Sequence, residues 1–349
     1  MPSRDGRTTL AIIAASAGVS VATVSKVVNG RADVSSDTRK RVETLLRQHQ
    51  YKVRRRSTQV RRSSATTRIE LLVEYPMNGY SSEIMQGVLD AAYEAQVSVA
   101  LRVGTGAGDD DDAPVRLPTG WARDLVDAGR QAVIAVVGAL TPDDVAAVVQ
   151  AHLPLVTIDP ANIPRARMTS VGSTNFAGGL AATQHLLSLG HRRIAYIGGP
   201  ADTAHNQARL HGYRAAMEAE GLPILTGYVR YGMFHFQDGL LGAQELLGLP
   251  EPPTAIFAGS DETAAGVIEA ARVRGLRVPE DLSVVGFDDT RLARFSSPPL
   301  TTIRQPLREM GGVALRTALR LAAGEKLDSH HVELATQLVV RGSTAPCAP

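Results

Sequence analysis

The sequence has a single cysteine, Cys347, close to its C-terminal end. With one thiol no disulfide can form within the chain, which is typical of proteins from a reducing compartment. Apolar runs are short, and none approaches the roughly 20 residues that a membrane-spanning helix needs. Residues 1–22 resemble a signal peptide only in part, because the apolar run is limited to Leu10–Ala15 and Asp5 interrupts the basic leader. These features favour a cytoplasmic protein over a secreted one.

The short motifs of common enzyme classes are also missing. No P-loop, HExxH, CxxC or GxSxG pattern occurs. The stretch GTGAGD (104–109) imitates a dinucleotide-binding loop, but its third glycine is absent and the acidic run 109–112 would repel a pyrophosphate. His330 and His331 are adjacent, so on a strand they would point to opposite faces and could not chelate a metal together. We therefore expect no enzyme activity, no cofactor and no metal.

Charge is distributed unevenly along the 349 residues, although the formal net charge is only +2. Residues 1–67 contain 14 Lys or Arg against four Asp or Glu, a net charge of +10, which leaves −8 for the remaining 282 residues. The length predicts two or three domains, and 44% hydrophobic residues are enough for a sizeable core. A small basic module ahead of a larger acidic body favours a polyanion partner for the first part alone.

The first fifty residues show three short helical patterns. Gly18, between the first two, suits a turn that needs a positive φ, and Ser20 and Ser35 are placed to cap the second and third helices. Two short helices joined by a glycine turn are typical of a helix-turn-helix unit, whose second helix enters the DNA major groove. A generic three-helix bundle is the alternative, but the positive charge favours DNA binding. The predicted inward-facing residues are Leu10, Ile13, Ala14, Ala17, Val24, Val27, Val28, Val42, Leu45 and Leu46.

The segment TTLAIIAASAGVSVATVSKVVNGRADVSSDTRKRV resembles the headpiece of the lactose/galactose repressor (LacI/GalR) family. The resemblance implies base contacts from Val21 and Ala22, the first residues of the recognition helix, and from Lys26 one turn later. Val21 and Ala22 can only touch thymine methyl groups or exclude a base, whereas Lys26 can donate a hydrogen bond to guanine. Residues expected to contact phosphate or to cap helices are Thr23, Ser25, Asn29 and Ser35.

The stretch YKVRRRSTQVRR (51–62) carries six Lys or Arg and no acid. In the LacI/GalR family the corresponding segment folds on operator DNA into a short helix, and a leucine wedges into the minor groove. Val60 stands at the wedge position here, and valine is a weaker helix former and a smaller wedge. We expect Arg55 and Arg56 to contact the minor groove and phosphates, and DNA binding to fall steeply as salt rises.

Beyond residue 67 the pattern changes to alternating strands and helices. This alternation predicts parallel, doubly wound sheets, and its two successive sets predict two lobes with a ligand cleft between them. The predicted strands are 69–74, 97–103, 131–137 and 153–159 in the first set, and 192–198, 227–232, 253–259 and 282–288 in the second. The predicted domains are a headpiece at 1–51, a hinge at 52–67 and a core at 68–349, with a first lobe at about 68–165 plus 302–328 and a second at about 166–301 plus 329–345.

Ligands of such sheets bind beyond the carboxyl ends of the strands, so polar residues at those ends are candidates. Carboxylates and Arg bind hydroxyl groups by charge-assisted hydrogen bonds, and an aromatic ring covers the apolar face of a sugar. Each candidate has a structural alternative: Asp159 could shape a turn, Phe234 could pack in the core, and for Asp261 we favour a role in stabilising a helix N-terminus. The candidates are Asp159, Arg209, Phe234, Ser260, Asp261 and Asp288.

Most of residues 168–306 resemble the effector-binding core of the LacI/GalR family, through VGSTNFAGGLAATQHLLSLGHRRIAYIGG, RLHGYRAAM, PTAIFAGSDETAAGVIEAA and VPEDLSVVGFDDT. The resemblance implies a periplasmic-binding-protein-like core and a small effector, most often a sugar. Many members have Asn where this chain has Ser260, so no particular effector is implied. The effector contacts implied by position are Arg209, Asp288, Phe234, Asp159, Ser260, Tyr80 and Ser81.

Together these patterns predict a transcriptional repressor that binds a palindromic operator as a homodimer and is released by a sugar or oligosaccharide. Because no leucine heptads follow the core, we expect a dimer rather than a tetramer. The alternatives are a sugar-binding protein of a transport system with a misassigned N-terminus, a regulator that uses a non-sugar corepressor, and a sugar enzyme. The basic headpiece argues against the transport protein, and the missing nucleophile motifs argue against the enzyme.

Overall fold

The computed structural model describes residues 10–28, 34–48, 67–73, 77–103, 117–136, 140–161 and 168–347. The chain divides into two compact units, Met1–Ala65 and Thr66–Pro349, which are called here the headpiece and the core. Five residues predicted to contact DNA are affected by the gaps. Asn29, Arg55, Arg56 and Val60 lie outside the described residues, as does the side chain of Ser25.

The described part of the headpiece contains α1 (Leu10–Ala17), α2 (Val21–Val28) and α3 (Ser36–Gln48). Gly18 links α1 to α2 with a φ of +68°, as the sequence predicts. The hydroxyl of Ser20 accepts a hydrogen bond from the Thr23 backbone N–H (3.1 Å), and that of Ser35 accepts one from Thr38 (3.4 Å), so both predicted caps are confirmed. The buried residues of this unit are Ile13, Ala14, Ala17, Val24, Val27 and Val42.

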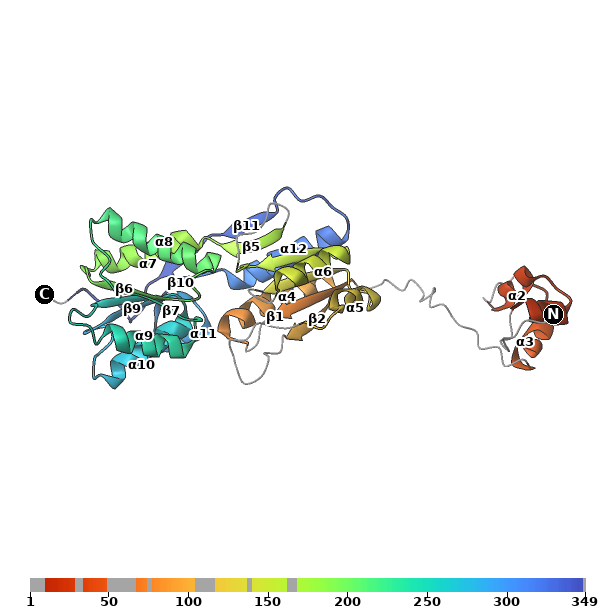
Figure 1. The fold of residues 1–349 in the computed structure, drawn as a ribbon, viewed down its shortest axis with the longest axis horizontal. Coiled ribbons are helices and arrows are strands. Elements are labelled where there is room, and N and C mark those ends of the chain that lie inside the picture. Colours follow the sequence, from red (N-terminus) through yellow and green to blue (C-terminus); the bar gives the residue numbers. More distant parts are fainter. Residues whose placement is uncertain are drawn as a thin grey trace. The chain divides into compact units, whose positions relative to one another are not determined.

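The core contains two sheets, each in a separate lobe (Figure 1). The sheet of the first lobe has the strand order β11-β5-β4-β3-β1-β2, and all its neighbouring strands are parallel. Its strands are β1 (Arg68–Val73), β2 (Ser98–Val103), β3 (Ala132–Val136), β4 (Leu155–Ile158), β5 (Thr169–Ser173) and β11 (His331–Leu334).

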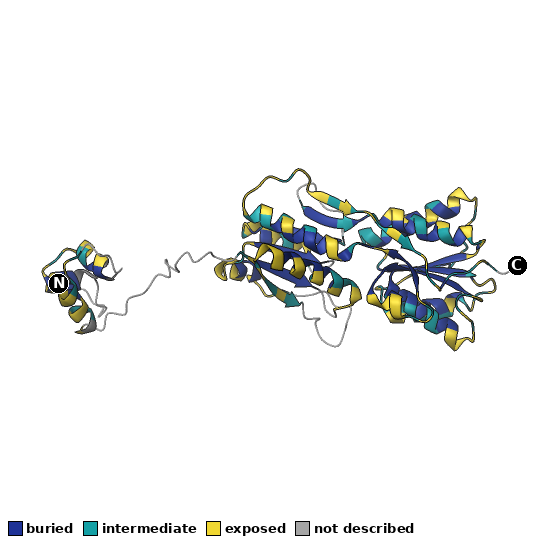
Figure 2. Cartoon of the chain, turned by 180° about the vertical axis from the view of Figure 1, so that it is seen from behind, coloured by how far each residue is buried: buried dark blue, intermediate teal, exposed yellow. Residues whose placement is uncertain are grey.

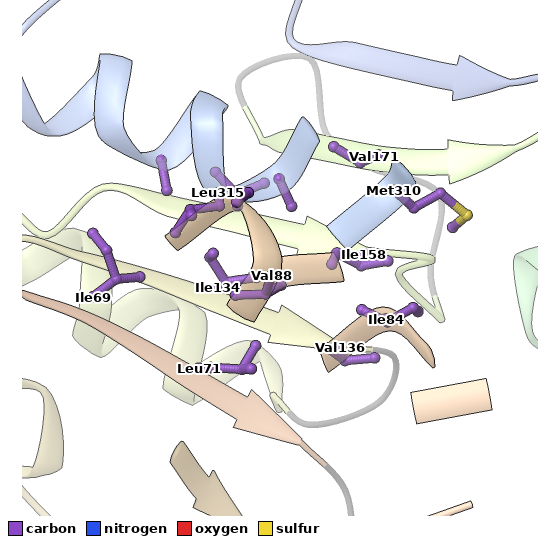
Figure 3. Close-up of a cluster of buried hydrophobic side chains, with 14 of the residues drawn as sticks. Ile69, Leu71, Ile84, Val88, Ile134, Val136, Ile158, Val171, Met310 and Leu315 are labelled. Carbon is purple, nitrogen blue, oxygen red and sulfur yellow. The ribbon is translucent and has the colours of Figure 1, made fainter. Parts of the chain in front are cut away.

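Helices cover both faces of the first sheet. On one face α4 (Gly79–Ala95) and α12 (Leu307–Ala322) pack on the strands and bury a continuous apolar cluster, which Figure 3 shows in close-up. On the opposite face α5 (Trp121–Asp127) and α6 (Pro142–Gln150) bury a second cluster around Trp121. Burial on both faces explains the continuous apolar runs of these strands, because a parallel sheet has no solvated side.

The second lobe repeats this design. Its strand order is β12-β10-β9-β8-β6-β7, parallel except for the pair β10 and β12. Helices α7 (Asn175–Ser188) and α8 (Ala204–Ala219) cover one face, and α9 (Phe236–Leu246) and α10 (Asp261–Val273) cover the other, while α11 (Arg291–Phe295) follows β9. The strands are β6 (Ile194–Gly198), β7 (Val229–Tyr231), β8 (Ala255–Ala258), β9 (Ser283–Asp288), β10 (Thr301–Arg304) and β12 (Gln337–Val339).

All eight predicted strands are present, but the lobe boundaries differ from the predicted ones at three other strands. β5 and β11 pair within the first sheet, although the predicted ranges assign them to the second lobe. β10 pairs with β9 in the second sheet, although the predicted range places it in the first lobe. The sequence does not reveal β5 as a strand, because TSVGS is short and mostly polar. Its position is decided by pairing with β4 and β11.

The described chain therefore passes between the lobes at three places, called here the crossovers. The first crossover is Ser173–Thr174, between β5 and α7. The second is Gln305–Pro306, between β10 and α12, and the third is Ala335–Thr336, between β11 and β12. Three adjacent connections allow one lobe to rotate against the other, as in domain closure around a ligand.

Pairs of glycines set the distance between packed helices. At the crossing of α4 and α12, a Cβ on Gly87 would overlap the backbone carbonyl of Arg308, and one on Gly311 would overlap that of Ile84. Gly179 and Gly212 play the same part between α7 and α8, and Gly239 and Gly266 between α9 and α10. Each crossing is closer than any side chain would permit.

Burial follows this architecture: the strands are largely buried, and the helices expose only their outer faces (Figure 2). Among the helices that the structure describes, none is long and apolar enough to cross a membrane.

Candidate functional site

The predicted recognition helix α2 presents an open face. Val21 is 48% exposed, Ala22 and Lys26 are exposed, and the opposite positions Val24 and Val27 are buried. The hydroxyl of Thr23 lies 2.9 Å from that of Ser20, so Thr23 helps to close the start of the helix. This placement makes Val21, Ala22 and Lys26 available for groove contacts, and their roles in base recognition stay predictions.

The first lobe contributes a buried carboxylate and a phenol to the predicted effector site. Asp159 follows β4 with a φ of +45° and accepts a hydrogen bond from the Tyr80 hydroxyl (Oη to Oδ2, 2.7 Å). Burial raises the pKa of Asp159, and the nearby Arg209 partly opposes that rise. Burial and the neighbouring carboxylate raise the pKa of Tyr80 well above its usual range. The phenol is therefore a hydrogen-bond donor at neutral pH.

The second lobe contributes Arg209 from α8. Its side chain is buried and donates to Asn175 Oδ1 (2.8 Å) and to the carbonyl of Gly259 (2.6 Å). One guanidinium nitrogen lies 4.0 Å from Asp288 Oδ1, and the guanidinium carbon lies 3.9 Å from the ring centre of Phe287. Held on three sides, the guanidinium has a fixed direction, as recognition of a ligand oxygen requires.

Asp288 ends β9 with a φ of +112° and is buried. Burial raises its pKa to about 7, against the lowering effects of Arg209 and of a hydrogen bond from Gln305 Nε2 (2.7 Å), and Asp159 adds to the rise. Asp159 of the first lobe is thus close enough to affect a carboxylate of the second. The two predicted ligand acids, one in each lobe, are therefore linked electrostatically.

Phe234 lies over the glycines that follow two strands of the second sheet. A Cβ on Gly199, after β6, would overlap its ring, and one on Gly259, after β8, would lie 2.8 Å from it. The Arg209 guanidinium carbon lies 5.3 Å from the ring centre. The ring is therefore at the carboxyl edge of the sheet, beside Arg209, which supports a ligand-facing role over simple core packing.

Three of the candidate side chains already make hydrogen bonds within the protein. Ser260 caps α10 by accepting from the Thr263 backbone N–H (3.0 Å) and lies 2.9 Å from the carbonyl of Phe234. Ser81 belongs to the capping box of α4. Asp261 accepts from Thr290 N (2.7 Å), among other bonds, so its carboxylate joins α10 to the segment that follows β9. The effector contacts predicted for Ser81 and Ser260 gain no support from these arrangements.

His205 is a candidate that the sequence reading did not include. It lies on α8 one turn before Arg209, and its ring centre is 5.5 Å from that of Phe234. Its Nδ1 is buried and has no hydrogen-bond partner among the residues described. Burial, together with Arg209, lowers its pKa to about 3, so the ring is neutral at physiological pH. His205 and Arg209 are four residues apart, so they share one face of the helix, and this spacing is the signal in the sequence that could have indicated His205.

The described residues include no group of three His, Cys, Asp or Glu arranged to hold a metal ion. The site instead offers carboxylates, a fixed guanidinium, a phenol and an aromatic ring. Groups of these kinds can bind a small polar molecule by directed hydrogen bonds and by stacking.

Known proteins share both units. Residues 9–53 match the family described as bacterial regulatory proteins, lacI family, and residues 183–344 match the periplasmic binding protein-like domain. The transcriptional regulator DegA of Bacillus subtilis is 33% identical, over 97% of this chain and 99% of the relative. The ribose operon repressor of Escherichia coli is 33% identical, over 96% and 99%.

Solved structures agree along nearly the whole chain. The complex of the transcriptional regulator CelR with cellobiose is 32% identical, with a TM-score of 0.70, over 97% of this chain and all of that one. The Lac repressor dimer bound to operator and an anti-inducer is 27% identical, with a TM-score of 0.69, over 97% and 99%. The chain therefore belongs to the LacI family of bacterial regulatory proteins and is a DNA-binding transcriptional regulator.

Proposed function

We propose that the protein represses transcription as a homodimer on a near-palindromic operator and is released when a sugar binds between the lobes of its core. One observation carries the effector part of this proposal. In the first lobe Tyr80 donates to Asp159 at 2.7 Å, and in the second a nitrogen of Arg209 lies 4.0 Å from Asp288. Charges in each pair influence the pKa values of the other pair, so the four residues form one electrostatically connected group. A ligand that satisfies both halves favours the closed arrangement of the lobes, because only that arrangement makes all the contacts.

A neutral polyhydroxylated ligand fits this group best. The carboxylates accept hydrogen bonds from hydroxyls, Arg209 donates them, and the ring of Phe234 can cover an apolar sugar face. Two structural relatives support the ligand class: CelR was solved with cellobiose, and a LacI-family regulator of Enterococcus faecium, 26% identical with a TM-score of 0.69, was solved with ribose.

The dimer follows from the symmetry of the expected operator. Two headpieces related by a two-fold axis read two half-sites, as the Lac repressor dimer bound to operator illustrates. A change in lobe position that alters the spacing of the headpieces needs only a few kcal/mol of coupling to release DNA. The protein then acts in the cytoplasm, on the chromosome, by binding and without catalysing a reaction.

Sugars that bind the core will raise its melting temperature. We expect one or more members of a panel of mono- and disaccharides, including ribose and cellobiose, to stabilise the full-length protein by several degrees, since a ligand that binds only the folded state adds to its stability. The same sugar should lower affinity for an operator in fluorescence anisotropy. A sugar that stabilises the core but strengthens operator binding would show corepression instead.

Replacing Lys26 by alanine should weaken operator binding by about 1–3 kcal/mol and relax the preference at one base pair, if this exposed side chain reads a base. Anisotropy titrations on the operator and on single-base variants measure both effects. Lys40→Ala is the matched control, because Lys40 is also exposed on the headpiece but lies on α3. An equal loss on every sequence would show that Lys26 contacts only phosphate.

A further inference from the structure

The first crossover holds a buried serine that reaches both halves of the proposed effector site. Ser173 ends β5, and its hydroxyl donates to Gln305 Oε1 at 2.5 Å. Gln305 belongs to the second crossover and donates in turn from Nε2 to Asp288 Oδ1 at 2.7 Å. The amide of Gln305 is therefore held at both ends, and the two bonds together fix its position between Ser173 and Asp288.

Two more connections leave the same residue. The backbone of Ser173 acts on the carboxylate of Asp159 and favours its charged form, which lowers the pKa of that acid. The carbonyl of Ser173 accepts a hydrogen bond from Asn175 Nδ2 (3.1 Å). Asn175 in turn accepts a hydrogen bond at Oδ1 from Arg209 Nε (2.8 Å). Asp288 and Arg209 are thus each joined to Ser173 through a single side chain, and the backbone of Ser173 also influences Asp159.

The neighbouring threonine ties the third crossover to the first but does not extend to these ligand candidates. The hydroxyl of Thr174 lies 3.0 Å from that of Thr336 and also accepts from the Thr336 backbone N–H (3.0 Å). The dipeptide Ser173–Thr174 therefore connects all three crossovers. Only its serine half also connects to the acids and the arginine of the proposed effector site.

We infer that Ser173 is a positioning residue, which orients Gln305 and through it Asp288 and so connects the effector site to the hinge between the lobes. This inference rests on the proposed function, which makes the site an effector site. The hydrogen bonds that join Ser173, Gln305 and Asp288 do not depend on that proposal. A ligand that engages Asp288 pulls on Gln305, which spans two crossovers. The position of the lobes and the occupancy of the site then change together.

The titration of Asp288 reports the link without any effector. Since Gln305 donates to the charged form of Asp288, loss of this donor should raise the pH at which the carboxylate ionises by about one unit. The other groups whose charge influences this carboxylate or is influenced by it are Arg209 on α8, Asp159 after β4, Asp261 and Glu262 on α10, and Tyr80 on α4.

The experiment follows the melting temperature of the full-length protein from pH 5 to pH 9 in four backgrounds: unchanged, Ser173→Ala, Gln305→Leu and Thr336→Val. Subtracting the profile of the Asp288→Asn version in each background isolates the step that Asp288 produces. The step is a fall in stability that levels off at the pKa of Asp288 in the folded protein. We expect the pH at which it levels off to rise by about one unit in Gln305→Leu and by less in Ser173→Ala. Thr336→Val should lower the melting temperature without moving that pH.

Combining Ser173→Ala with Gln305→Leu separates an effect through Gln305 from a direct one. We expect the step in the double variant to level off at the same pH as in Gln305→Leu alone, because Ser173 acts through the amide that is already gone. The inference would be overturned if the step levelled off at the same pH in Ser173→Ala as in Thr336→Val, or if the shifts added in the double variant. If Gln305→Leu does not fold, the comparison of Ser173→Ala with Thr336→Val still decides.

Hydrogen–deuterium exchange tests the connection to the hinge. In Ser173→Ala, peptides over both the first and the second crossover should take up deuterium faster, whereas Thr336→Val should affect peptides over the first and third. Faster uptake at the first crossover alone would show that Ser173 serves only its own strand end. Neither the pH experiment nor the exchange experiment uses a sugar. A sugar screen without a hit would therefore count against the proposed function, whereas unchanged titration and exchange in Ser173→Ala would count against the inference.

Discussion

Asp288→Asn is expected to abolish the response to effector and to leave operator affinity without effector unchanged. The substitution removes a buried negative charge that lies 4.0 Å from Arg209 and accepts from Gln305. Losing a buried charge-assisted hydrogen bond typically costs 2–5 kcal/mol, so we expect affinity for the sugar to fall about a hundredfold or more. Isothermal titration with a sugar from the thermal screen, together with operator anisotropy, measures both quantities.

The same substitution should stabilise the core at neutral and higher pH. The pKa of Asp288 is about 7 in the folded protein, above its ordinary value of 3.8, so between these two pH values the folded chain holds a proton that the unfolded chain releases. Stability therefore falls as pH rises from about 4 to about 7 and changes little above that range. Asparagine does not titrate, so at pH 8 the variant should be more stable than the original chain, by up to roughly 4 kcal/mol.

Asp289→Asn is the matched control for both effects. Asp289 is the next residue and is also buried, but it pairs with Arg304 at 2.6 Å and with Arg341. Only the carboxylate of Asp289 is buried, and Arg304 is 44% exposed, so losing the charge should destabilise the core by about 1.5–3 kcal/mol and leave the intrinsic sugar affinity unchanged. If Asp288→Asn instead destabilised the core and abolished operator binding, Asp288 would be a structural residue and the effector proposal would lose its principal acid.

Gly311→Ala is expected to destabilise the first lobe strongly, whereas Gly312→Ala is not. A Cβ on Gly311 would overlap the backbone carbonyl of Ile84, so α4 and α12 would have to move apart. Overpacking of this kind costs about 3 kcal/mol, which corresponds to roughly 6–10 °C in melting temperature for a unit of this size. Differential scanning calorimetry of the full-length variants gives the comparison.

Gly312 is the neighbour on the same buried stretch of α12, and a Cβ there would lie 3.1 Å from the end of the exposed Arg316 side chain. That flexible end can move, and alanine favours a helix over glycine by about 1 kcal/mol. We therefore expect Gly312→Ala to be neutral or slightly stabilising. Equal losses in the two variants would mean that helix spacing at Gly311 is not what limits the substitution.

Local patterns were sufficient wherever one segment determines its own structure. The turn at Gly18, the caps Ser20 and Ser35, and the apolar face of α2 follow from conformational preference and helical period. The buried parallel strands follow from continuous apolar runs. β5 could not be found in this way, because its short polar sequence becomes a strand only by pairing with β4 and β11.

The candidate site likewise contains residues that local sequence could indicate and residues whose roles it could not. Arg209, Asp288, Phe234 and Asp159 could be named in advance because each follows a recognisable strand in a doubly wound sheet. The structural uses of Ser81 and Ser260 could not, since a hydroxyl at a helix start serves either a cap or a ligand, and only the surrounding atoms decide.

The sequence alone determined the class of the protein: a basic helix-turn-helix headpiece before two α/β lobes, with polar residues at the strand ends. Periodicity, charge and turn residues act over a few positions, so they can be read without knowing the fold. Only the tertiary structure decided which lobe holds each short strand, how closely the glycine-paired helices approach, and that Ser173 contacts Gln305 across 132 positions of sequence. Such contacts depend on packing between distant segments, and no local pattern records them.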